Sequence, residues 1–281
     1  MINVLKVVKI HPLFWLVLGS GVITGYFKEV VMMFLIVFVH EMGHALMAKH
    51  YDWRLTKVEL LPFGGVAETE EYGNRPVKEE VLVIVAGPLQ HLWLIALSYG
   101  LLHFDWWTAA DHSIFLFHNV TILGFNLLPI KPLDGGKLFF SLQTAIFPYR
   151  DAFYGSFYFS LFCLSLFWIV ALTLLPFHLN LLVVLSFLAV HHYLEWKQRH
   201  FIFMRFLIER VEKKAVSSVK RIRPIFVQGD ERIQQVMKAL RRDCSHVIIL
   251  KQSGKTLEEK KALEAYFDEK KRLLSIETIF S

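Results

Sequence analysis

Long apolar stretches separated by short polar segments occupy the first two-thirds of the chain. Each is about 20 residues long, the length that a helix needs to cross the hydrocarbon core of a bilayer. A buried helix of a soluble protein is the alternative for any single stretch, but six in series argue against a soluble fold. The stretches that we predict to span a membrane are residues 10–26, 28–48, 80–102, 112–130, 153–175 and 178–196.

The composition supports a polytopic α-helical membrane protein with about six transmembrane helices. Hydrophobic residues make up 54% of the chain, and its mean hydropathy is +0.42. Lys6 and Lys9 precede the first stretch, but no small-residue cleavage site follows it. We therefore do not expect a signal peptide that is removed.

The placement of Lys and Arg predicts the orientation in the membrane, because cytoplasmic loops carry an excess of both. The connection 103–111 has neither, and Lys28 is the only basic residue in the other connections on that side. The opposite side, with both termini, carries Lys6, Lys9, Lys49, Arg54, Lys57, Arg75, Lys78, Lys131, Lys137, Arg150 and the basic tail. Both termini are thus predicted to be cytoplasmic. The net charge of +6 reflects this bias, so we expect no direct binding to nucleic acid.

Apolar character ends near Trp196, and the tail that follows is predicted to be soluble and cytoplasmic. Its pattern predicts a strand at 224–227, a helix at 231–242, a strand at 246–250 and a helix at 257–271. The chain is thus predicted to have three parts: a transmembrane domain at 1–196, a basic helical linker at 197–218 and a small α/β domain at 219–281. The linker is expected to lie along the anionic membrane surface.

The run His40-Glu41-Met42-Gly43-His44 closes the second apolar stretch. On a helix, His40 and His44 lie on one face, so both imidazoles can bind one metal ion. Glu41 lies beside them, where its carboxylate can take a proton from a metal-bound water. The alternative is a chance match in a chain that contains 13 His. Because Glu and His are costly at membrane depth and usually mark function there, we predict a zinc hydrolase site.

A catalytic zinc ion usually has three protein ligands, so a third residue is needed. The best candidate is Asp134, in the run Asn126-Leu-Leu-Pro-Ile-Lys-Pro-Leu-Asp-Gly-Gly136 at the cytoplasmic end of the fourth stretch. Pro129 and Pro132 are expected to break the helix there, and the two glycines permit tight backbone geometry. On spacing alone, a turn or helix-capping role for Asp134 is the favoured alternative.

The connection 51–79 is too long for a simple turn. Two short apolar runs flank Gly64-Gly65, which predicts a β-hairpin or a loop that dips toward the membrane. The hairpin is either a plain cytoplasmic connection or an exposed strand edge that receives an unwound substrate segment by strand addition.

The motifs HEMGH, in one predicted span, and NLLPIKPLDGG, at the end of a later one, resemble those of the site-2 protease family of intramembrane zinc metalloproteases. The resemblance covers about residues 30–140. It implies that His40, His44 and Asp134 bind one zinc ion per chain and that Glu41 is the catalytic acid/base. Further candidates for substrate binding or oxyanion stabilisation are Asn126, Pro132, Phe63, Gly64 and Gly65.

The soluble tail, together with the lack of a PDZ-like insertion, resembles the sporulation branch of this family. Members of that branch cleave an inactive mother-cell sigma-factor precursor during endospore formation. The resemblance implies a sigma-factor precursor as substrate, inhibitory membrane proteins as partners, and a location in the mother-cell-derived membrane around the forespore.

The tail also resembles a cystathionine-β-synthase (CBS) domain, through Pro224-Ile225, Ile233 to Met237 and His246 to Ile249. The glycine-isoleucine strand expected after the second turn is replaced by a predicted helix. The resemblance makes ATP a candidate ligand, but the missing strand departs from the pattern that forms the standard adenine-nucleotide pocket. A module that only docks substrate is the alternative.

These patterns predict peptide-bond hydrolysis near the cytoplasmic face of the membrane. Polar Asn119, Thr121 and Asn126 of the fourth stretch could let water reach the site. The other histidines, His91 among them, show no ligand spacing and are predicted to be packing or interfacial residues. The rival interpretation is a non-enzymatic membrane protein, such as a metal transporter or a scaffold that sequesters a partner.

Overall fold

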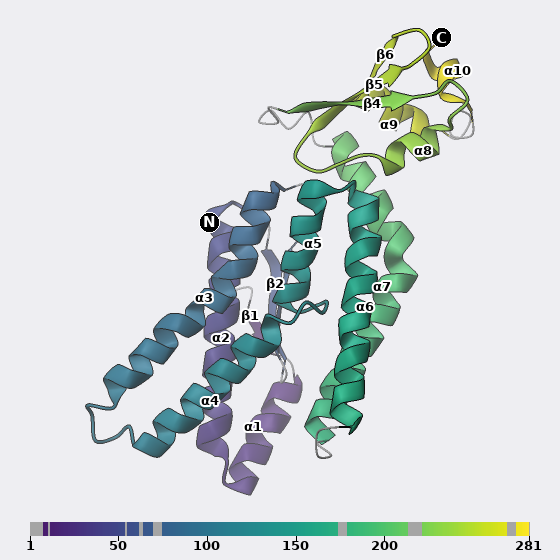
Figure 1. The fold of residues 1–281 in the computed structure, drawn as a ribbon. Helices are drawn as coiled ribbons and strands as arrows, with labels where there is room; N and C mark the ends of the chain where they lie inside the picture. The colour runs from purple at the N-terminus through teal and green to yellow at the C-terminus, as the bar shows by residue number, and fades with distance from the viewer. Residues whose placement is uncertain are drawn as a thin grey trace. The chain divides into compact units, whose positions relative to one another are not determined.

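The computed structural model describes residues 8–10, 12–53, 55–61, 64–69, 75–173, 179–212, 221–268 and 274–280. Helices dominate the fold, and two three-stranded sheets accompany them (Figure 1). Contacts between Cα atoms divide the chain into two compact units. The first contains Met1–Glu71, Lys78–Leu138 and Cys163–Leu188, and the second contains Tyr72–Val77, Phe139–Phe162 and Ala189–Ser281.

Each of the six predicted membrane stretches contains a helix, although the ends of some stretches, such as residues 127–130, are not helical. The helices are α1 (Pro12–Thr24), α2 (Phe27–His50), α3 (Val77–Leu101), α4 (Ala109–Asn126), α6 (Tyr149–Thr173) and α7 (Leu179–Glu212). Among the described residues, α2, α3, α6 and α7 are long and apolar enough to cross a membrane. Helices α1 and α4 are not among these candidates. Helix α1 has 13 described residues, and the 18 residues of α4 include the polar residues His118 and Asn119. Four candidate spans are thus found, and the count of six stays a prediction.

The outer faces of these helices expose large apolar side chains. Leu35 of α2, Trp93 of α3, and Phe162 and Leu172 of α6 are all exposed. A soluble protein rarely leaves so much apolar surface open to water, whereas lipid covers it at little cost. The exposed faces therefore support a membrane protein.

The predicted hairpin is present in the first unit. Strand β2 (Leu55–Leu61) pairs antiparallel with β3 (Gly64–Thr69), with Gly65 opposite Leu60 and Gly64 opposite Leu61. A third strand that the sequence does not predict, β1 (Val8–Ile10), pairs parallel with β2, giving the order β1-β2-β3. Both hairpin strands contact α2, which also packs against α1 and α4 (Figure 1). This arrangement places the sheet beside the helix that carries the HEMGH motif.

A helix that the sequence does not predict, α5 (Asp134–Ile146), follows the proline-containing turn. Helix α4 ends at Asn126, before Pro129, as expected. The glycines then allow a close approach: a Cβ on Gly135 would lie 2.2 Å from the Leu127 carbonyl oxygen, and one on Gly136 would lie 2.5 Å from the Lys131 nitrogen. Asp134 is thereby held at the first position of a helix whose start is packed tightly against the preceding turn.

The C-terminal part has strands β4 (Ile222–Val227), β5 (Ser245–Leu250) and β6 (Thr256–Glu258), with helices α8 (Ile233–Lys238), α9 (Glu259–Phe267) and α10 (Ile276–Phe280). Strand β5 pairs parallel with β4 and antiparallel with β6. The predicted strand-helix-strand order is present, but the helix covers Ile233–Lys238 and is shorter than the predicted 231–242. The helix predicted from Leu257 is present as α9, but it begins two residues later, at Glu259, because residues 256–258 extend the sheet. Likeness to a CBS domain stays a prediction.

The core of the second unit combines the C-terminal domain with parts of two long helices. Tyr149 at the start of α6 stacks on Phe206 of α7, with ring centroids 4.0 Å apart. Both belong to the same buried cluster as Ile233, Met237 and Ile248. Helix α7 runs without a break from the apolar stretch to Glu212, so the described part of the predicted linker is helical.

The loop after α8 makes hydrogen bonds to three segments within the second unit. The Leu240 carbonyl accepts from the backbone nitrogen of Tyr149 at 2.9 Å. The Asp243 carboxylate accepts from the nitrogen of Val77, the first residue of α3, at 2.9 Å. Arg242 donates to the hydroxyl of Thr144, near the end of α5, at 3.3 Å. The C-terminal domain is therefore attached at the first residue of α3, the last turn of α5 and the first residue of α6.

Candidate metal centre

Two histidines of α2 form the first half of the centre. His40 and His44 lie one helical turn apart, both are buried, and their Nε2 atoms are 3.1 Å apart. Their rings meet nearly edge-on, with an interplanar angle of 83°. The four-residue spacing thus points both Nε2 atoms at one position, as a helix allows.

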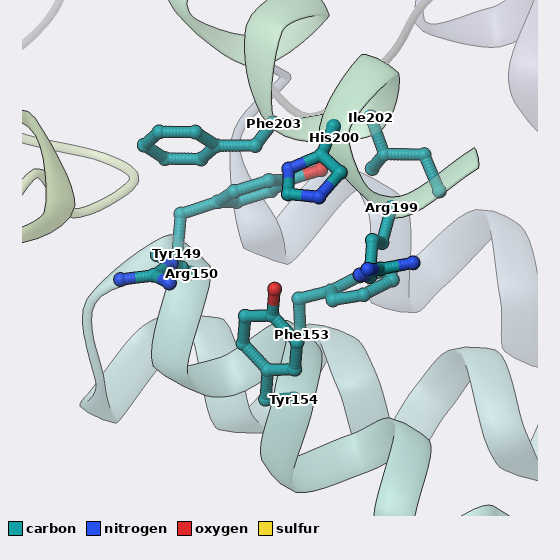
Figure 2. A pocket seen from close by; sticks show the side chains of 8 residues that line it. All are labelled: Tyr149, Arg150, Phe153, Tyr154, Arg199, His200, Ile202 and Phe203. Carbon is teal, nitrogen blue, oxygen red and sulfur yellow. The ribbon is translucent and has the colours of Figure 1, made fainter. Parts of the chain in front are cut away.

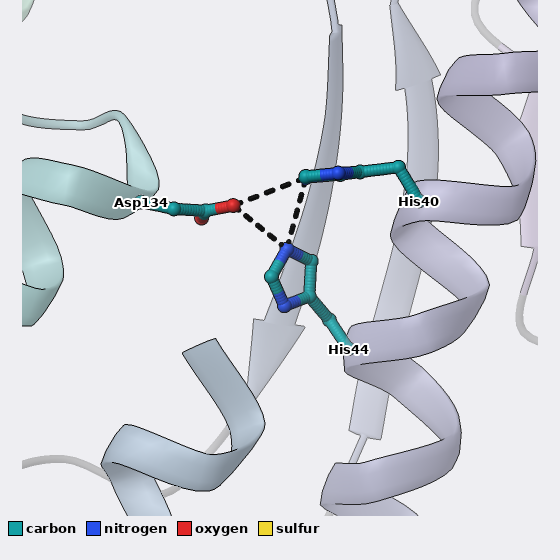
Figure 3. Close-up of side chains that lie close together, drawn as sticks. All are labelled: His40, His44 and Asp134. Carbon is teal, nitrogen blue, oxygen red and sulfur yellow. Dashed lines mark hydrogen bonds and ion pairs between the residues drawn. The ribbon is translucent and has the colours of Figure 1, made fainter. Parts of the chain in front are cut away.

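Asp134 supplies the second half from a segment 90 residues further along the chain. Its Oδ2 atom lies 3.0 Å from Nε2 of His40 and 3.0 Å from Nε2 of His44 (Figure 3). The carboxylate is buried, at 4% exposure. The structure thus brings together the three residues that the sequence proposes as ligands.

The three atoms fit a zinc ion. One ligand atom from each residue lies within 4.8 Å of the others, and the measured separations are 3.0–3.1 Å. Ligand atoms about 2.0 Å from a tetrahedral zinc are about 3.3 Å apart, so the three form nearly one face of such a tetrahedron. Two neutral imidazoles and one carboxylate form a known type of catalytic zinc site, which keeps its fourth position open.

Hydrogen bonds to the far side of each imidazole fix the ring orientation. The Nδ1 atom of His44 lies 2.8 Å from the carbonyl oxygen of Val83 on α3, to which it donates. The Nδ1 atom of His40 lies 3.1 Å from Nε2 of His91, also on α3. The other carboxylate oxygen of Asp134 pairs with Lys137 at 3.4 Å. Such hydrogen bonds, made to the ligand side chains by residues that do not themselves bind the metal, orient the ligands and are typical of metal sites.

Glu41 is buried beside the two histidines, at 7% exposure. In the part of the chain that the structure describes, its carboxylate has no hydrogen-bond or ion-pair partner. A carboxylate that no protein group occupies can accept a proton from water, as its predicted acid/base role requires.

The remaining predicted site residues do not join the cluster. The Asn126 amide donates to the carbonyl of Ile122 at 3.1 Å, at the end of α4. Pro132 is half-buried in the turn before α5 and follows a cis peptide bond. Gly64 and Gly65 open strand β3, and Phe63 lies outside the described residues. Their roles in substrate binding stay predictions.

Sequence reasoning did not place three residues next to the candidate metal centre: it assigned His91 to packing and Asn119 to a path for water, and it did not single out Gly87, which lies against the His44 ring. His91 and Asn119 are fully buried and lie within 3.1 Å of each other, which also shows that Asn119 does not line an open path for water. Polar residues inside apolar stretches are costly in lipid, and this signal could have identified both. Gly87 gave no such signal, because glycine is common in membrane helices.

A pocket separate from the cluster lies between α6 and α7 in the second unit. It is lined by Tyr149, Arg150, Phe153, Tyr154, Arg199, His200, Ile202 and Phe203 (Figure 2). Its volume of about 30 Å³ is far below the 300 Å³ or more of a typical small-molecule site. It has room for water and not for a nucleotide.

Comparison with known proteins places the chain in a family. Residues 28–109 match the model of peptidase family M50. Stage IV sporulation protein FB of Bacillus subtilis is 40% identical over 97% of this chain and 95% of its own length. A zinc metalloprotease of Methanocaldococcus jannaschii is 30% identical over 42% of this chain and 35% of its own length.

A solved structure supports the fold independently. The site-2 protease from Methanocaldococcus jannaschii superposes with a TM-score of 0.52, covering 67% of this chain and 89% of that chain at 24% identity. At that identity the likeness shows the fold alone. The extended match to the Bacillus relative, with the family model over α2 and α3, carries the assignment. This chain belongs to peptidase family M50, the site-2 proteases, and is a metalloendopeptidase of that type.

Proposed function

We propose that the chain hydrolyses a peptide bond of a membrane-associated protein near the cytoplasmic face, with one zinc ion held by His40, His44 and Asp134. The observation that supports this most strongly is the convergence of Nε2, Nε2 and Oδ2 within 3.1 Å, beside the buried carboxylate of Glu41. Membership in a metalloprotease family favours this role over a metal transporter or a scaffold.

The chemistry divides between the metal and the chain. When bound, zinc lowers the pKa of a coordinated water toward about 7 and polarises a carbonyl. Glu41 accepts the proton of the attacking water and then delivers it to the leaving amide nitrogen. Glu41 and the three proposed ligands are buried, so the transfers occur in a medium of low polarity, where charges act strongly.

The proposed substrate is a sporulation sigma-factor precursor. The support is 40% identity, over nearly the whole of both chains, to a protein named for stage IV of sporulation. With this substrate come inhibitory membrane proteins as partners and a location in the mother-cell-derived membrane around the forespore.

We further propose six membrane spans, with both termini in the cytoplasm, and a division into residues 1–196, 197–218 and 219–281. The Lys and Arg bias and the six helical stretches support this topology. A reporter fused at position 107 should give the signal of the non-cytoplasmic side, and a cytoplasmic signal there would exclude the six-span model.

The free edge of strand β3 is proposed to receive the unwound substrate segment. Strand β3 pairs with β2 on one edge, and among the described strands nothing pairs with its other edge. Strand addition supplies main-chain hydrogen bonds to a segment that has given up its own helical bonds. Strand β3 begins with Gly64 and Gly65, and a residue without a Cβ permits the close approach of another backbone.

The C-terminal domain is proposed to engage the soluble part of the substrate and to regulate cleavage. A single helix entering the membrane offers little contact area, so a second binding surface would raise specificity. Binding of ATP to this CBS-like domain rests on the sequence resemblance alone. Cleavage that does not change with ATP concentration would remove the nucleotide from the proposal and leave the docking role intact.

Co-expression with a sigma-factor precursor tests the substrate. The wild-type chain should yield a shortened precursor, and the Glu41→Gln variant, made to the same level, should not. A precursor that stays full length with the wild-type chain would reject this substrate. Cleavage of an unrelated membrane-bound test protein by the same chain would then show that the protease assignment still holds.

A further inference from the structure

We propose that His91 and Asn119 are positioning residues for the metal centre: they fix the tautomer and the ring orientation of His40. The inference rests on the proposed role of His40 as a zinc ligand. It follows from a chain of hydrogen bonds that leads from the metal centre through α3 to α4.

The chain has three members on three helices. His40 of α2 lies 3.1 Å from His91 of α3, measured from Nδ1 to Nε2. The Nδ1 atom of His91 lies 3.1 Å from Oδ1 of Asn119 on α4. The Nδ2 atom of Asn119 donates to the Phe115 carbonyl, one turn earlier, at 3.0 Å. The three hydrogen bonds thus connect His40 to His91, His91 to Asn119, and Asn119 to the backbone of its own helix.

These distances leave one consistent arrangement of protons. A ligand histidine binds through a nitrogen that carries no proton, and the Nε2 atom of His40 is the one that faces Asp134. Its single ring proton is therefore on Nδ1 and is donated to Nε2 of His91. Because His91 accepts there, its own proton is on Nδ1 and is donated to the Asn119 carbonyl oxygen.

The hydrogen bonds of Asn119, the last member of the series, fix the orientation of its amide. Its NH₂ group donates to a backbone carbonyl, so its oxygen must be the atom that faces His91. The helix of α4 thus determines the orientation of the amide, the amide determines the tautomer of His91, and His91 determines that of His40. Reversing any one proton would leave two donors or two acceptors facing each other.

Burial leaves these three side chains few alternatives to the hydrogen bonds described above. His91 and Asn119 have no exposed surface, and His40 is 2% exposed. Met32, Ile36, Leu94 and Phe115, which lie on the same three helices, form a buried apolar cluster whose side chains have no polar atoms other than the Met32 sulfur. An unsatisfied polar group in such surroundings costs about 1–3 kcal/mol, so the rings are held in place.

The two ligand histidines are supported differently. His44 donates to a backbone carbonyl, which no substitution can remove. His40 depends on a side chain, so its orientation can be changed by mutation. Loss of such an outer contact typically weakens metal binding 10–100-fold.

A purely structural role is the competing explanation, since polar side chains also join membrane helices to one another. The test must therefore measure the metal and not only activity. His192 provides a matched control, because it is also a buried histidine of a long apolar helix and bonds Ser160 at 2.7 Å. Its hydrogen-bond partner Ser160 is not one of the proposed ligands.

The experiment uses the full chain in detergent or lipid nanodiscs. Zinc affinity is measured by competition with a chelator, and the visible absorption of the Co²⁺-substituted protein reports on the ligand field. We expect His91→Leu to weaken zinc binding 10–100-fold and to shift the Co²⁺ bands. His91→Gln, whose carbonyl oxygen can accept from His40, should restore affinity to within a few fold, and His192→Leu should match the wild type.

Three results would overturn the inference. They are zinc affinity within twofold of wild type in His91→Leu with unchanged Co²⁺ bands, an equal loss in His192→Leu, and no rescue by His91→Gln. If His91→Leu does not accumulate in folded form, Asn119→Leu decides, because it keeps both imidazoles and should still weaken binding. A wild-type chain that binds no zinc would instead reject the proposed function, so the two failures are distinguishable.

Discussion

Gly87 of α3 lies directly against the imidazole of His44. A Cβ atom built on Gly87 would come within 2.2 Å of Nε2 and 2.4 Å of Cε1 of that ring. One residue earlier on α2, a Cβ on Gly43 would lie 2.5 Å from the Ala86 carbonyl oxygen. The two glycines let α2 and α3 approach closely enough for α3 to support both proposed histidine ligands.

Replacement of Gly87 by alanine should therefore disturb the metal centre. Alanine in a helix is ordinarily more stable than glycine by up to about 1 kcal/mol. At this position the added methyl group must displace the His44 ring, so we expect at least a tenfold loss of zinc affinity. Chelator competition on the purified chain measures it.

Gly100 on the same helix is the matched control. A Cβ there meets nothing within 4 Å, so Gly100→Ala should leave zinc affinity unchanged. Equal zinc affinity in Gly87→Ala and Gly100→Ala would contradict the close contact with His44.

The Asp243 carboxylate should protect the start of α3 from exchange. Asp243 has a left-handed backbone, with φ of 55°, and its carboxylate accepts a hydrogen bond from the backbone nitrogen of Val77, the first residue of α3. Asp243→Ala removes the acceptor and tolerates that backbone poorly. We expect faster hydrogen exchange at Val77 and weaker cleavage of a full-length precursor, with normal zinc content.

Asp243→Asn is the informative comparison, because asparagine adopts the left-handed conformation and its carbonyl oxygen can accept the same bond. It should behave like the wild type in both measurements. If Asp243→Asn and Asp243→Ala exchanged equally fast at Val77, this contact would not hold the helix.

Glu259 should make the stability of the C-terminal domain depend on pH. Burial by itself raises the pKa of Glu259, but the hydrogen bond with His246 and the charge of Arg210 outweigh it and lower the pKa to about 2. A lowered folded-state pKa stabilises the domain at pH above the usual value of 4.5. That contribution, on the order of 3 kcal/mol, is lost as the pH falls from about 4.5 toward 2.

Hydrogen exchange in β5 and α9 of the full chain can measure this contribution. Glu259→Gln should lower protection relative to the wild type at pH 6, and the difference should shrink as the pH falls below 4.5. Comparing the two proteins at each pH cancels the intrinsic exchange rates. A difference that stayed constant from pH 6 to pH 3 would show that the carboxylate charge is not what stabilises the domain.

The sequence predicted those parts of the structure that depend on local pattern. The six helical stretches follow from apolar length, and His40 and His44 face one point because a helix repeats every 3.6 residues. The hairpin around Gly64-Gly65 follows from turn chemistry. Asp134 was reached through the resemblance, since spacing alone favoured a capping role.

The parts that sequence reasoning missed depend on contacts between distant segments. Pro129 and Pro132 signalled a break but not that α5 begins two residues later. His91 touches His40 across 51 positions, and nothing near it in the chain marks that partner. Strand β6 is three residues long and is identified by its pairing with β5 rather than by its own pattern.

The central claim is that a zinc ion held by His40, His44 and Asp134 works with Glu41 to cleave a peptide bond. The most direct measurement determines zinc content and precursor cleavage on the same purified preparations of the wild type and Glu41→Gln. We predict about one zinc per chain in both proteins and a 10²- to 10⁴-fold lower cleavage rate in Glu41→Gln. Cleavage by Glu41→Gln at the wild-type rate, with zinc bound, would contradict the account.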